Sequence, residues 1–405
     1  QSLDEGGSIV WEHVINLLPC PFLALSATIG NPECFRNWLA FSQERYHREV
    51  RVVTHKYRWA DLKLQVYNPD LDDESLLQIT ATNEAPEKSN LSHLHPVASL
   101  SLTTIQEEDS LFHLRLSPEE LYQLYHILQT LAGDFQSELE ELDPDKYFSG
   151  LILRYDVFEY ETKLKNLIVA WSRDEQKVSV IEKALAELSG TIHSKDAEYP
   201  SSSQFCYDYF LALLVELHNN EKLPALVFSL DRHRCNRLVT DLVKKLDQME
   251  TAETQRPDYQ RKLKEYQKRQ EKLGKKKKKN RDKDEKEAKC AADATNDDNF
   301  TAELPGKDER FSFLRKGEGA HDDDKQFWIN RISQTSDFIT TLVNGLDRGI
   351  GVHHGALPSA YRTAVEVLFR SGHLKVVIST GTLSLGINMP CKTVVFAGDS
   401  HALTP

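Results

Sequence analysis

Continuously apolar runs alternate with amphipathic stretches near the start of the chain. PFLALS (21–26) is apolar almost throughout and predicts a fully buried strand, and EVRVVTH (49–55) predicts a second one. Apolar positions at helical spacing predict a helix from Ile9 to Leu18, and Asn31 followed by Pro32 predicts the start of another that ends near Leu39. Alternating helices and strands indicate an α/β fold with a parallel sheet.

The same alternation returns in the second half of the chain. KLPALVFSL (222–230), LKVVIS (374–379) and TVVFAG (393–398) are uniform enough to predict central strands, and a charged helix is expected from Asp231. Leu357-Pro358 predicts the start of a helix that Gly372 ends. Its buried face is expected to hold Val365, Leu368 and Phe369.

Between these two halves the apolar pattern is weaker and becomes mainly helical. Ser, Asn, Glu and Pro accumulate from about 70 to 110, which predicts an insertion or a mobile loop. Ser117-Pro118-Glu119-Glu120 predicts a helix that begins with a capping box. Helical patterns follow at 151–189 and 204–218. We expect the region 70–220 to pack outside the sheet or to be partly mobile.

Composition narrows the class of protein. The 405 residues carry a formal charge of -12, so no global basic field attracts nucleic acid and any such contact must be local. The six cysteines contain no CxxC pair, which argues against a disulfide framework or a zinc site. No apolar run approaches a membrane span. Because the chain starts at Gln1, we expect an excised piece of a longer protein.

A lysine-rich segment, QKRQEKLGKKKKKNRDKDEKEAK, follows the helix that begins at Asp231. Its mixed charge cannot bury enough apolar surface to order itself, which favours a solvated tether. A basic arm that touches RNA phosphates is the alternative.

Two of the predicted strands end in small hydroxyl residues. FLAL runs into Ser26-Ala27-Thr28, and KVVI runs into Ser379-Thr380-Gly381-Thr382. Ligands of open α/β sheets bind at the carboxyl ends of the strands, where hydroxyls and exposed amides contact phosphates. Serine and threonine also simply terminate strands and cap helices, so this pattern has a purely structural explanation as well.

Four strings in a fixed order carry a family resemblance. They are LALSATIGNP, LPALVFSLDRHRC, GIGVHHGALP, and STGTLSLGINMP with TVVF after it. Together they resemble the third to fifth motifs of superfamily-two helicases, specifically the superkiller-like DExH-box RNA helicases, and within them the interferon-inducible antiviral DExD/H-box branch. In GIGVHHGALP, Gly355-Ala356 stands in swapped order relative to the family's His-His-Ala-Gly string. The resemblance covers about 1–65, 222–240 and 345–398.

The resemblance implies RecA-like parallel sheets flanked by helices. Residues 1–54 would be the C-terminal part of an ATP-binding RecA-like domain. Residues 55–405 would form most of the helicase C-terminal RecA-like domain, with insertions at about 70–200 and a charged disordered spacer at about 250–325. The second sheet is expected to combine LKLQVY (62–67) with PALVFS, GIGVHH, KVVIST and TVVFAG.

The resemblance also implies an activity. The chain would be a fragment of a cytoplasmic ATP-dependent RNA helicase, an RNA-stimulated ATPase of antiviral innate immunity. Its partners would be RNA bound with low sequence specificity and innate immune RNA sensors, without membrane association. A non-catalytic RNA-binding or scaffold protein on a degenerate RecA-like fold is the alternative. A generic α/β enzyme would not carry four such strings in order.

Residue roles follow from the matched motifs. Ser26, Ala27 and Thr28 would couple ATP to RNA through domain closure. Thr380 and Thr382 would hold the RNA backbone. Four residues of the strings LPALVFSLDRHRC and GIGVHHGALP would do the same: Ser229, Arg234, His354 and Gly355. Gly386 and Asn388 would approach the nucleotide.

Several of these positions also have ordinary structural explanations. His353 and His354 lack metal ligands at zinc spacing, and they are either core or loop histidines or part of a loop that contacts the backbone. Arg232, Arg234 and Arg237 are either a phosphate platform at a helix N-terminus or a solvated helix face.

Three motifs that ATP hydrolysis needs are missing from the chain. It contains no GxxxxGK[ST] phosphate loop, no complete DExH box and no Arg-x-Gly-Arg string. ATP and Mg²⁺ would therefore bind through residues outside this fragment, which is not expected to be active by itself.

Overall fold

The structure is a computed structural model that describes residues 5–25, 31–54, 60–83, 88–107, 109–190, 202–261, 264, 268, 309–314, 322–332, 337–383 and 389–398. It divides into two compact units, Gln1–Leu62 and Lys63–Pro405. In the part of the chain that is described, no helix is long and apolar enough to cross a membrane.

The first unit contains two helices, α1 (Glu5–Leu17) and α2 (Pro32–Gln43), and the short helix η1 (Glu44–Tyr46). Asn31 caps α2 as predicted, because its side chain accepts a hydrogen bond of 3.0 Å from the Cys34 amide. The predicted strands at 21–26 and 49–55 are wrong over their described residues, which belong to no strand and pair with no neighbour. No described residue of this unit supplies a neighbouring strand, and a strand needs one to satisfy its amides.

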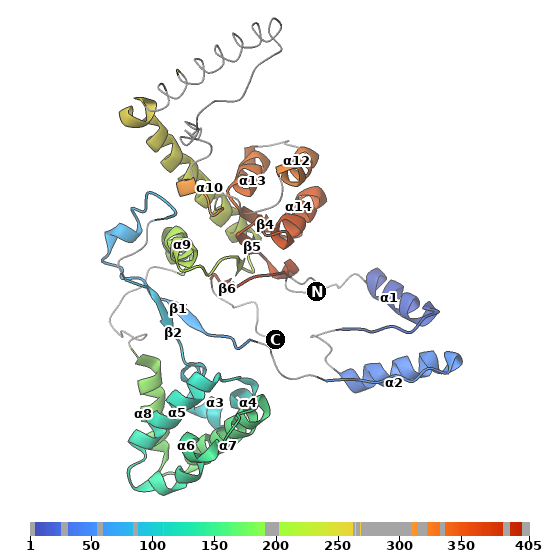
Figure 1. The fold of residues 1–405 in the computed structure, drawn as a ribbon, viewed down its shortest axis with the longest axis vertical. Helices are drawn as coiled ribbons and strands as arrows, with labels where there is room; N and C mark the ends of the chain where they lie inside the picture. Colours follow the sequence, from blue (N-terminus) through green and yellow to red (C-terminus); the bar gives the residue numbers. More distant parts are fainter. Residues whose placement is uncertain are drawn as a thin grey trace, which may run out of the picture. The chain divides into compact units, whose positions relative to one another are not determined.

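The second unit contains the predicted parallel sheet. Its strands are β3 (Ala225–Phe228), β4 (Ile350–His353), β5 (Val376–Ser379) and β6 (Thr393–Phe396). They lie in the order β4-β5-β3-β6, and every neighbouring pair is parallel. Strands β3 and β5 are central as predicted, whereas β6, which was also predicted to be central, lies at the end of the described sheet and leaves Val394 and Phe396 exposed. This arrangement, with helices packed around it, confirms a RecA-like α/β fold for this part of the chain (Figure 1).

The fifth strand assigned to this sheet is elsewhere. Within LKLQVY only β1 (Gln65–Tyr67) is a strand, and it pairs antiparallel with β2 (Leu91–His93) in a separate two-stranded ribbon. The ribbon instead contacts α9, where the buried Glu216 carboxylate accepts hydrogen bonds from Ser89 and from the Asn90 amide. The prediction failed because a short apolar stretch does not specify its pairing partner.

Helices cover the sheet and complete its core. They are α9 (Ser202–Asn219), α10 (Arg232–Gln255), α12 (Asp322–Arg331), α13 (Asp337–Asp347) and α14 (Ser359–Arg370), with the short η7 (Glu309–Phe311) and η8 (Gly381–Leu383). The predicted buried face of α14 is confirmed, because Val365, Leu368 and Phe369 are all buried. Gly372 follows α14 with a φ of 78°, the left-handed conformation expected of a glycine that ends a helix.

The predicted disordered spacer at 250–325 is wrong at both of its described ends. Helix α10 continues to Gln255, and the chain returns at 309–314 to bury Phe311 and Phe313. The Phe313 amide donates to the Arg348 carbonyl at 3.1 Å, and the Arg348 guanidinium bonds Asp247 and Glu250 of α10. Two buried phenylalanines therefore anchor a segment whose composition is otherwise polar.

Residues 96–190 form a helical region with a hydrophobic core of its own. Its elements are η3 (Pro96–Ser99), α3 (Leu102–Gln106), α4 (Asp109–His113), α5 (Pro118–Leu131), η4 (Gly133–Glu138), η5 (Glu140–Leu142), α6 (Pro144–Tyr147), α7 (Arg154–Arg173) and α8 (Val178–Ser189); η2 (Glu74–Leu76) precedes the region. This separate core agrees with the prediction that 70–220 packs outside the sheet, but only for this region. Helix α9, which belongs to the same range, packs in the core of the sheet instead.

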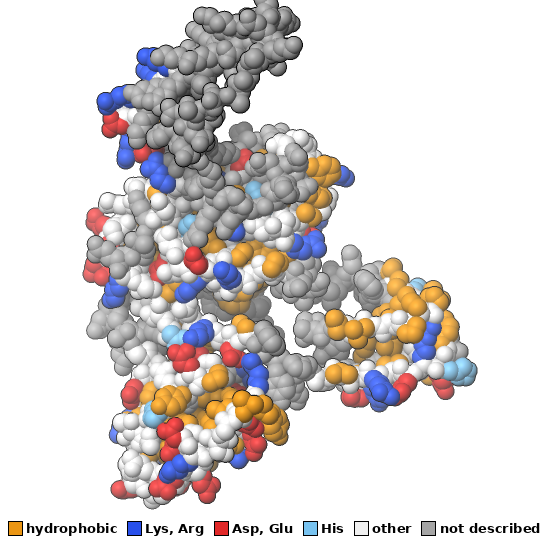
Figure 2. All heavy atoms as spheres, in the orientation of Figure 1, with side chains coloured by type: hydrophobic (Ala, Val, Ile, Leu, Met, Phe, Trp, Pro, Cys, Tyr) orange, Lys and Arg blue, Asp and Glu red, His pale blue; other side chains and the backbone are white. Residues whose placement is uncertain are grey.

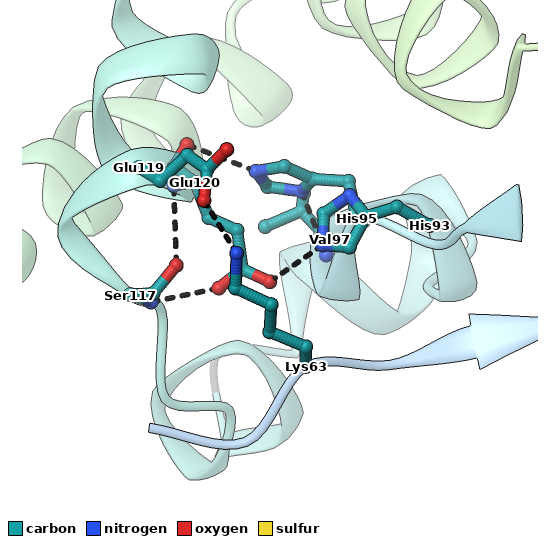
Figure 3. Close-up of polar contacts among 7 residues, drawn as sticks. All are labelled: Lys63, His93, His95, Val97, Ser117, Glu119 and Glu120. Atoms are coloured by element: carbon teal, nitrogen blue, oxygen red, sulfur yellow. Dashed lines mark hydrogen bonds and ion pairs between the residues drawn. The ribbon is translucent and has the colours of Figure 1, made fainter. Parts of the chain in front are cut away.

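The predicted capping box at the start of α5 is confirmed and also joins the helical region to the ribbon. Ser117 and Glu120 exchange hydrogen bonds, at 2.7 Å from the Ser117 amide and 3.3 Å from the Glu120 amide. The same Glu120 carboxylate contacts His93 at the end of β2, at 3.1 Å. Lys63 pairs with the neighbouring Glu119 at 2.7 Å (Figure 3).

Candidate functional site

The candidate site lies at the carboxyl ends of β3, β4 and β5. The strand register places Phe228 and His353 on either side of Ser379, so the residues that follow these three strands lie at one edge of the sheet. Those residues are Ser229, His354 and Thr380, which come from three of the four motif strings. The fold therefore brings together positions that are far apart in the sequence (Figure 1).

Hydrogen bonds between the strand ends hold this edge together. The Ser229 amide donates to the Ser379 carbonyl at 2.9 Å, and the Thr380 amide donates to the His353 carbonyl at 3.2 Å. The Ser379 hydroxyl also donates to the His353 carbonyl, at 3.0 Å. Because Ser379 is fully buried, it is a structural residue at the centre of the edge.

His353 positions Thr382. The imidazole is 3% exposed, and its Nδ1 lies 2.8 Å from the Thr382 hydroxyl while its Nε2 lies 3.0 Å from a Glu366 carboxylate oxygen. Burial lowers the pKa of His353, although the Glu366 contact opposes this shift. A neutral ring that donates from Nε2 and accepts at Nδ1 satisfies both partners. His353 is therefore a core histidine that orients an exposed threonine.

His354 is also buried, and Asn236 holds it. Its Nε2 lies 2.7 Å from the Asn236 side-chain oxygen, which comes from α10. Burial, and then the nearby Arg232 charge, lower the pKa of His354. Within the described residues, its Nδ1 and the Ser229 hydroxyl are buried and have no hydrogen-bond partner. Buried polar atoms of this kind are rare and point to a partner that the described chain does not supply.

The N-terminus of α10 borders the same edge. Asp231 caps the helix by accepting a hydrogen bond of 2.8 Å from the His233 amide, and Arg232 in the first turn is exposed. The Arg234 guanidinium lies against Gly398, where a Cβ atom would overlap it. Arg237 is engaged within the protein: its guanidinium stacks on the Tyr207 ring at 3.9 Å and lies 3.4 Å from Asp241. It is therefore not part of a phosphate platform at this helix N-terminus.

The predicted site residues fall into three groups. Ser229, His354, Thr380 and Thr382 come together at the edge, with Gly355 exposed directly after His354. Arg234 lies on the neighbouring helix turn. Ser26, Ala27, Thr28, Gly386 and Asn388 lie outside the described residues, so their assigned roles stay predictions.

Glu366 and Asn236 are the two residues that the sequence did not indicate. Glu366 lies beside the apolar face of α14, and Asn236 lies in a helix whose exposed face is rich in charge. Neither belongs to a motif string, and only the fold brings them within hydrogen-bonding distance of the histidines.

Cys235 and the acidic residues offer no alternative chemistry at this site. The Cys235 thiol donates to the Ser229 carbonyl at 3.4 Å, and burial raises its pKa to about 11, so it is a protonated core residue. Among the residues that the structure places, no group of three His, Cys, Asp or Glu side chains could hold a metal ion.

Comparison with known proteins shows that this chain is similar to helicases. Residues 326–402 match the helicase conserved C-terminal domain. An uncharacterized helicase of Caenorhabditis elegans is 32% identical over 425 aligned positions, which cover 98% of this chain and 24% of that protein. The probable ATP-dependent RNA helicase DDX60-like of Homo sapiens is 27% identical over 98% of this chain and 25% of its own length.

A third relative matches a shorter stretch. The ATP-dependent RNA helicase mtr4 of Schizosaccharomyces pombe is 53% identical over 51 residues, or 13% of this chain and 5% of that protein. The chain spans about a quarter of the length of the worm and human relatives. The chain is thus similar to helicases, and strands β4, β5 and β6 of its parallel sheet lie within the residues that match their C-terminal domain.

Proposed function

We propose that this chain is part of an ATP-dependent RNA helicase of the superkiller-like DExH-box group, and that the edge formed by β3, β4 and β5 contacts the RNA backbone. The observation that carries the proposal is the convergence of Ser229, His354, Thr380 and Thr382 at one edge of a RecA-like sheet. Similarity to proteins named RNA helicases supports it.

The chemistry of the edge suits a sugar-phosphate chain. The Thr380 hydroxyl donates to a phosphate oxygen, and the amides and Arg232 at the start of α10 add positive potential. The partnerless Ser229 hydroxyl is a further donor or acceptor within the edge. None of these groups distinguishes one base from another, so the proposed contact is insensitive to RNA sequence.

ATP and Mg²⁺ enter this proposal only through other residues. The described residues hold no acidic cluster fit for a metal, and the chain has no phosphate loop or DExH box. In the proposed protein, Ser26-Ala27-Thr28 couple the nucleotide state to closure between two RecA-like domains, while Gly386 and Asn388 approach the nucleotide from the second domain. When bound, ATP–Mg²⁺ would supply a phosphoryl group for transfer to water.

The proposed cellular role is antiviral innate immunity in the cytoplasm, with innate immune RNA sensors as partners. Its support is the resemblance of the four motif strings to the interferon-inducible antiviral branch of these helicases. A loss of interferon response to viral RNA in cells that lack the protein, restored by wild type, tests this role.

The decisive experiment measures RNA affinity and RNA-stimulated ATPase of the complete protein. Thr380→Val and Thr382→Val together should weaken RNA binding at least tenfold, because Thr380→Val alone removes a hydroxyl that donates to a charged oxygen, worth about 1.5 kcal/mol or more. Thr162→Val is a matched control, since this exposed threonine of α7 bonds only its own helix, at the Phe158 carbonyl. Unchanged RNA affinity in the double variant contradicts the proposed interface.

Thr28→Ala tests coupling separately. We expect RNA-stimulated hydrolysis to persist while duplex separation is lost. Retained unwinding would refute the coupling role. The absence of any ATPase activity in the complete wild-type protein would instead favour the alternative of a non-catalytic RNA-binding scaffold.

A further inference from the structure

The helical region carries most of the chain's net negative charge. Residues 96–190 contain 18 Asp and Glu against 8 Lys and Arg, a net charge of -10 within a chain of -12. This concentration makes the region a poor surface for RNA, because phosphates are repelled by it. The proposed RNA-binding edge lies in other elements, so the acidic region is free for a different role.

The same region exposes a contiguous apolar patch, the Leu151–Tyr155 patch, made of Leu151, Ile152, Leu153 and Tyr155. These side chains are 87%, 52%, 57% and 64% exposed, respectively. They follow α6 and Gly150, whose φ of 86° turns the chain, and they continue into the first turn of α7. Single exposed apolar residues are common, but a contiguous group marks an interaction site.

The patch is not a gap in an unfinished core. The core of the helical region is complete beneath it, with Tyr160, Leu164 and Trp171 of α7 all at most 2% exposed. Tyr147 and Phe148, just before the patch, pack their rings against Tyr160 at 5.1 Å. Tyr147, Phe148 and Val157, which flank the patch, are partly buried against this core, whereas the patch itself lies in solvent.

The charges around the patch indicate what covers it. The neighbouring elements η5 and α6 expose Glu140, Glu141 and Asp145. Lys146 pairs with Asp143 at 3.8 Å, and Lys163 pairs with Glu159 at 3.2 Å. Arg154 is exposed within the patch, between Leu153 and Tyr155, and it too has a partner in the chain. Figure 2 shows apolar and acidic side chains together on the visible face of the helical region, in the lower part of the view.

We propose that the Leu151–Tyr155 patch and its acidic surroundings form a docking site for a lysine- and arginine-rich segment of another protein that presents an apolar face. Apolar side chains of that segment cover the patch, and its basic side chains face Glu140, Glu141 and Asp145. Tyrosine and leucine in an accessible cluster provide the contact area, and the acidic rim provides selectivity and faster association.

The test uses a synthetic amphipathic peptide with leucines on one face and lysines on the other, measured against the whole 405-residue chain by fluorescence anisotropy. A second peptide has glutamate in place of every lysine. We expect the lysine peptide to bind and the glutamate peptide to bind at least tenfold more weakly. Replacing Leu151, Ile152 and Leu153 by serine should weaken the lysine peptide at least tenfold, and Glu140→Lys with Glu141→Lys should also weaken it.

Leu77→Ser is the matched control, because Leu77 is an exposed leucine outside the helical region, and it should leave the affinity unchanged. Thermal melting of each variant checks that folding is intact. Equal affinity of the patch variant and wild type overturns the proposal. So does competition by single-stranded RNA for the patch, or a concentration-dependent dimer that the serine substitutions abolish, since each assigns the patch to a different occupant.

Discussion

At the residue scale, the buried histidines decide what the candidate edge can do. From the sequence, His353 and His354 could belong to a loop that contacts the RNA backbone. In the structure both imidazoles bond protein side chains, and neither is exposed. Their effect is indirect: His353 fixes the exposed Thr382 hydroxyl, and His354 connects the end of β4 to α10. Both residues are therefore core histidines. The proposed contact with the RNA backbone is made by neighbouring groups such as the Thr380 hydroxyl.

The histidines make stability depend on pH. Burial lowers the pKa of His353, His354 and His95 below the ordinary value of 6.5. As the pH falls through 6.5, the unfolded chain binds these protons before the folded one, so the free energy of unfolding should decrease from there downwards. Urea unfolding at a series of pH values measures this. His354→Gln should flatten the dependence; a pH-independent wild type would contradict the prediction.

At the scale of single elements, the start of α5 is held by local bonds that the sequence specifies. Ser117→Ala removes the cap of the Glu120 amide and should lower the free energy of unfolding by about 1 kcal/mol. Ser137→Ala, at an exposed position in η4, is the control. If urea unfolding shows the same stability for Ser117→Ala and wild type, the capping box does not contribute to folding.

Strand β4 depends on a glycine for its packing against α14. A Cβ atom at Gly351 would lie 2.9 Å from Leu374 Cδ1 and 3.3 Å from Val365 Cγ1. Gly351→Ala should therefore destabilise the second unit by about 1–3 kcal/mol through overpacking. Adding Leu374→Val removes the closest atom, so the double variant should be more stable than the sum of its single effects predicts. Strict additivity in thermal unfolding would rule out this contact as the cause.

At the scale of the whole molecule, the charge distribution limits the number of phosphates that the proposed RNA-binding edge can contact. The chain is acidic overall, and its basic groups near the candidate edge are few, with Arg232 the exposed one in the first turn of α10. We expect about two to four phosphate contacts and thus a slope of log affinity against log salt of about -1 to -3. Arg232→Gln should make that slope shallower by about 0.7. Anisotropy titrations over a range of KCl concentrations measure it, and a much steeper slope would indicate a larger basic surface elsewhere.

Much of the second unit could be predicted from local pattern. The strands β3 to β6 are continuous apolar runs bounded by turn residues, and the helices α5 and α14 carry their own start and stop signals. The motif strings also indicated that hydroxyl residues follow the strands, and Ser229 and Thr380 do lie directly after β3 and β5. These features are local because propensity, capping and burial of a central strand act over a few neighbouring residues.

Other predictions failed where the outcome depends on a partner. The run at 21–26 is mostly apolar and the run at 49–55 contains three valines, but over their described residues they form no strand, since no neighbour pairs with them. The polar composition of 250–325 predicted disorder throughout, but Phe311 and Phe313 are buried, because they pack against residues that are distant in the sequence.

The sequence by itself determined the α/β class, the parallel strands of the second unit and the motif residues at their ends. Only the tertiary structure decided that Gln65–Tyr67 pairs with Leu91–His93, that Glu366 and Asn236 hold the two histidines, and that the Leu151–Tyr155 patch stays exposed. Each of these outcomes depends on which distant residues meet in the folded chain. Short-range spacing carries no information about such contacts, because they are selected by the packing of the whole unit.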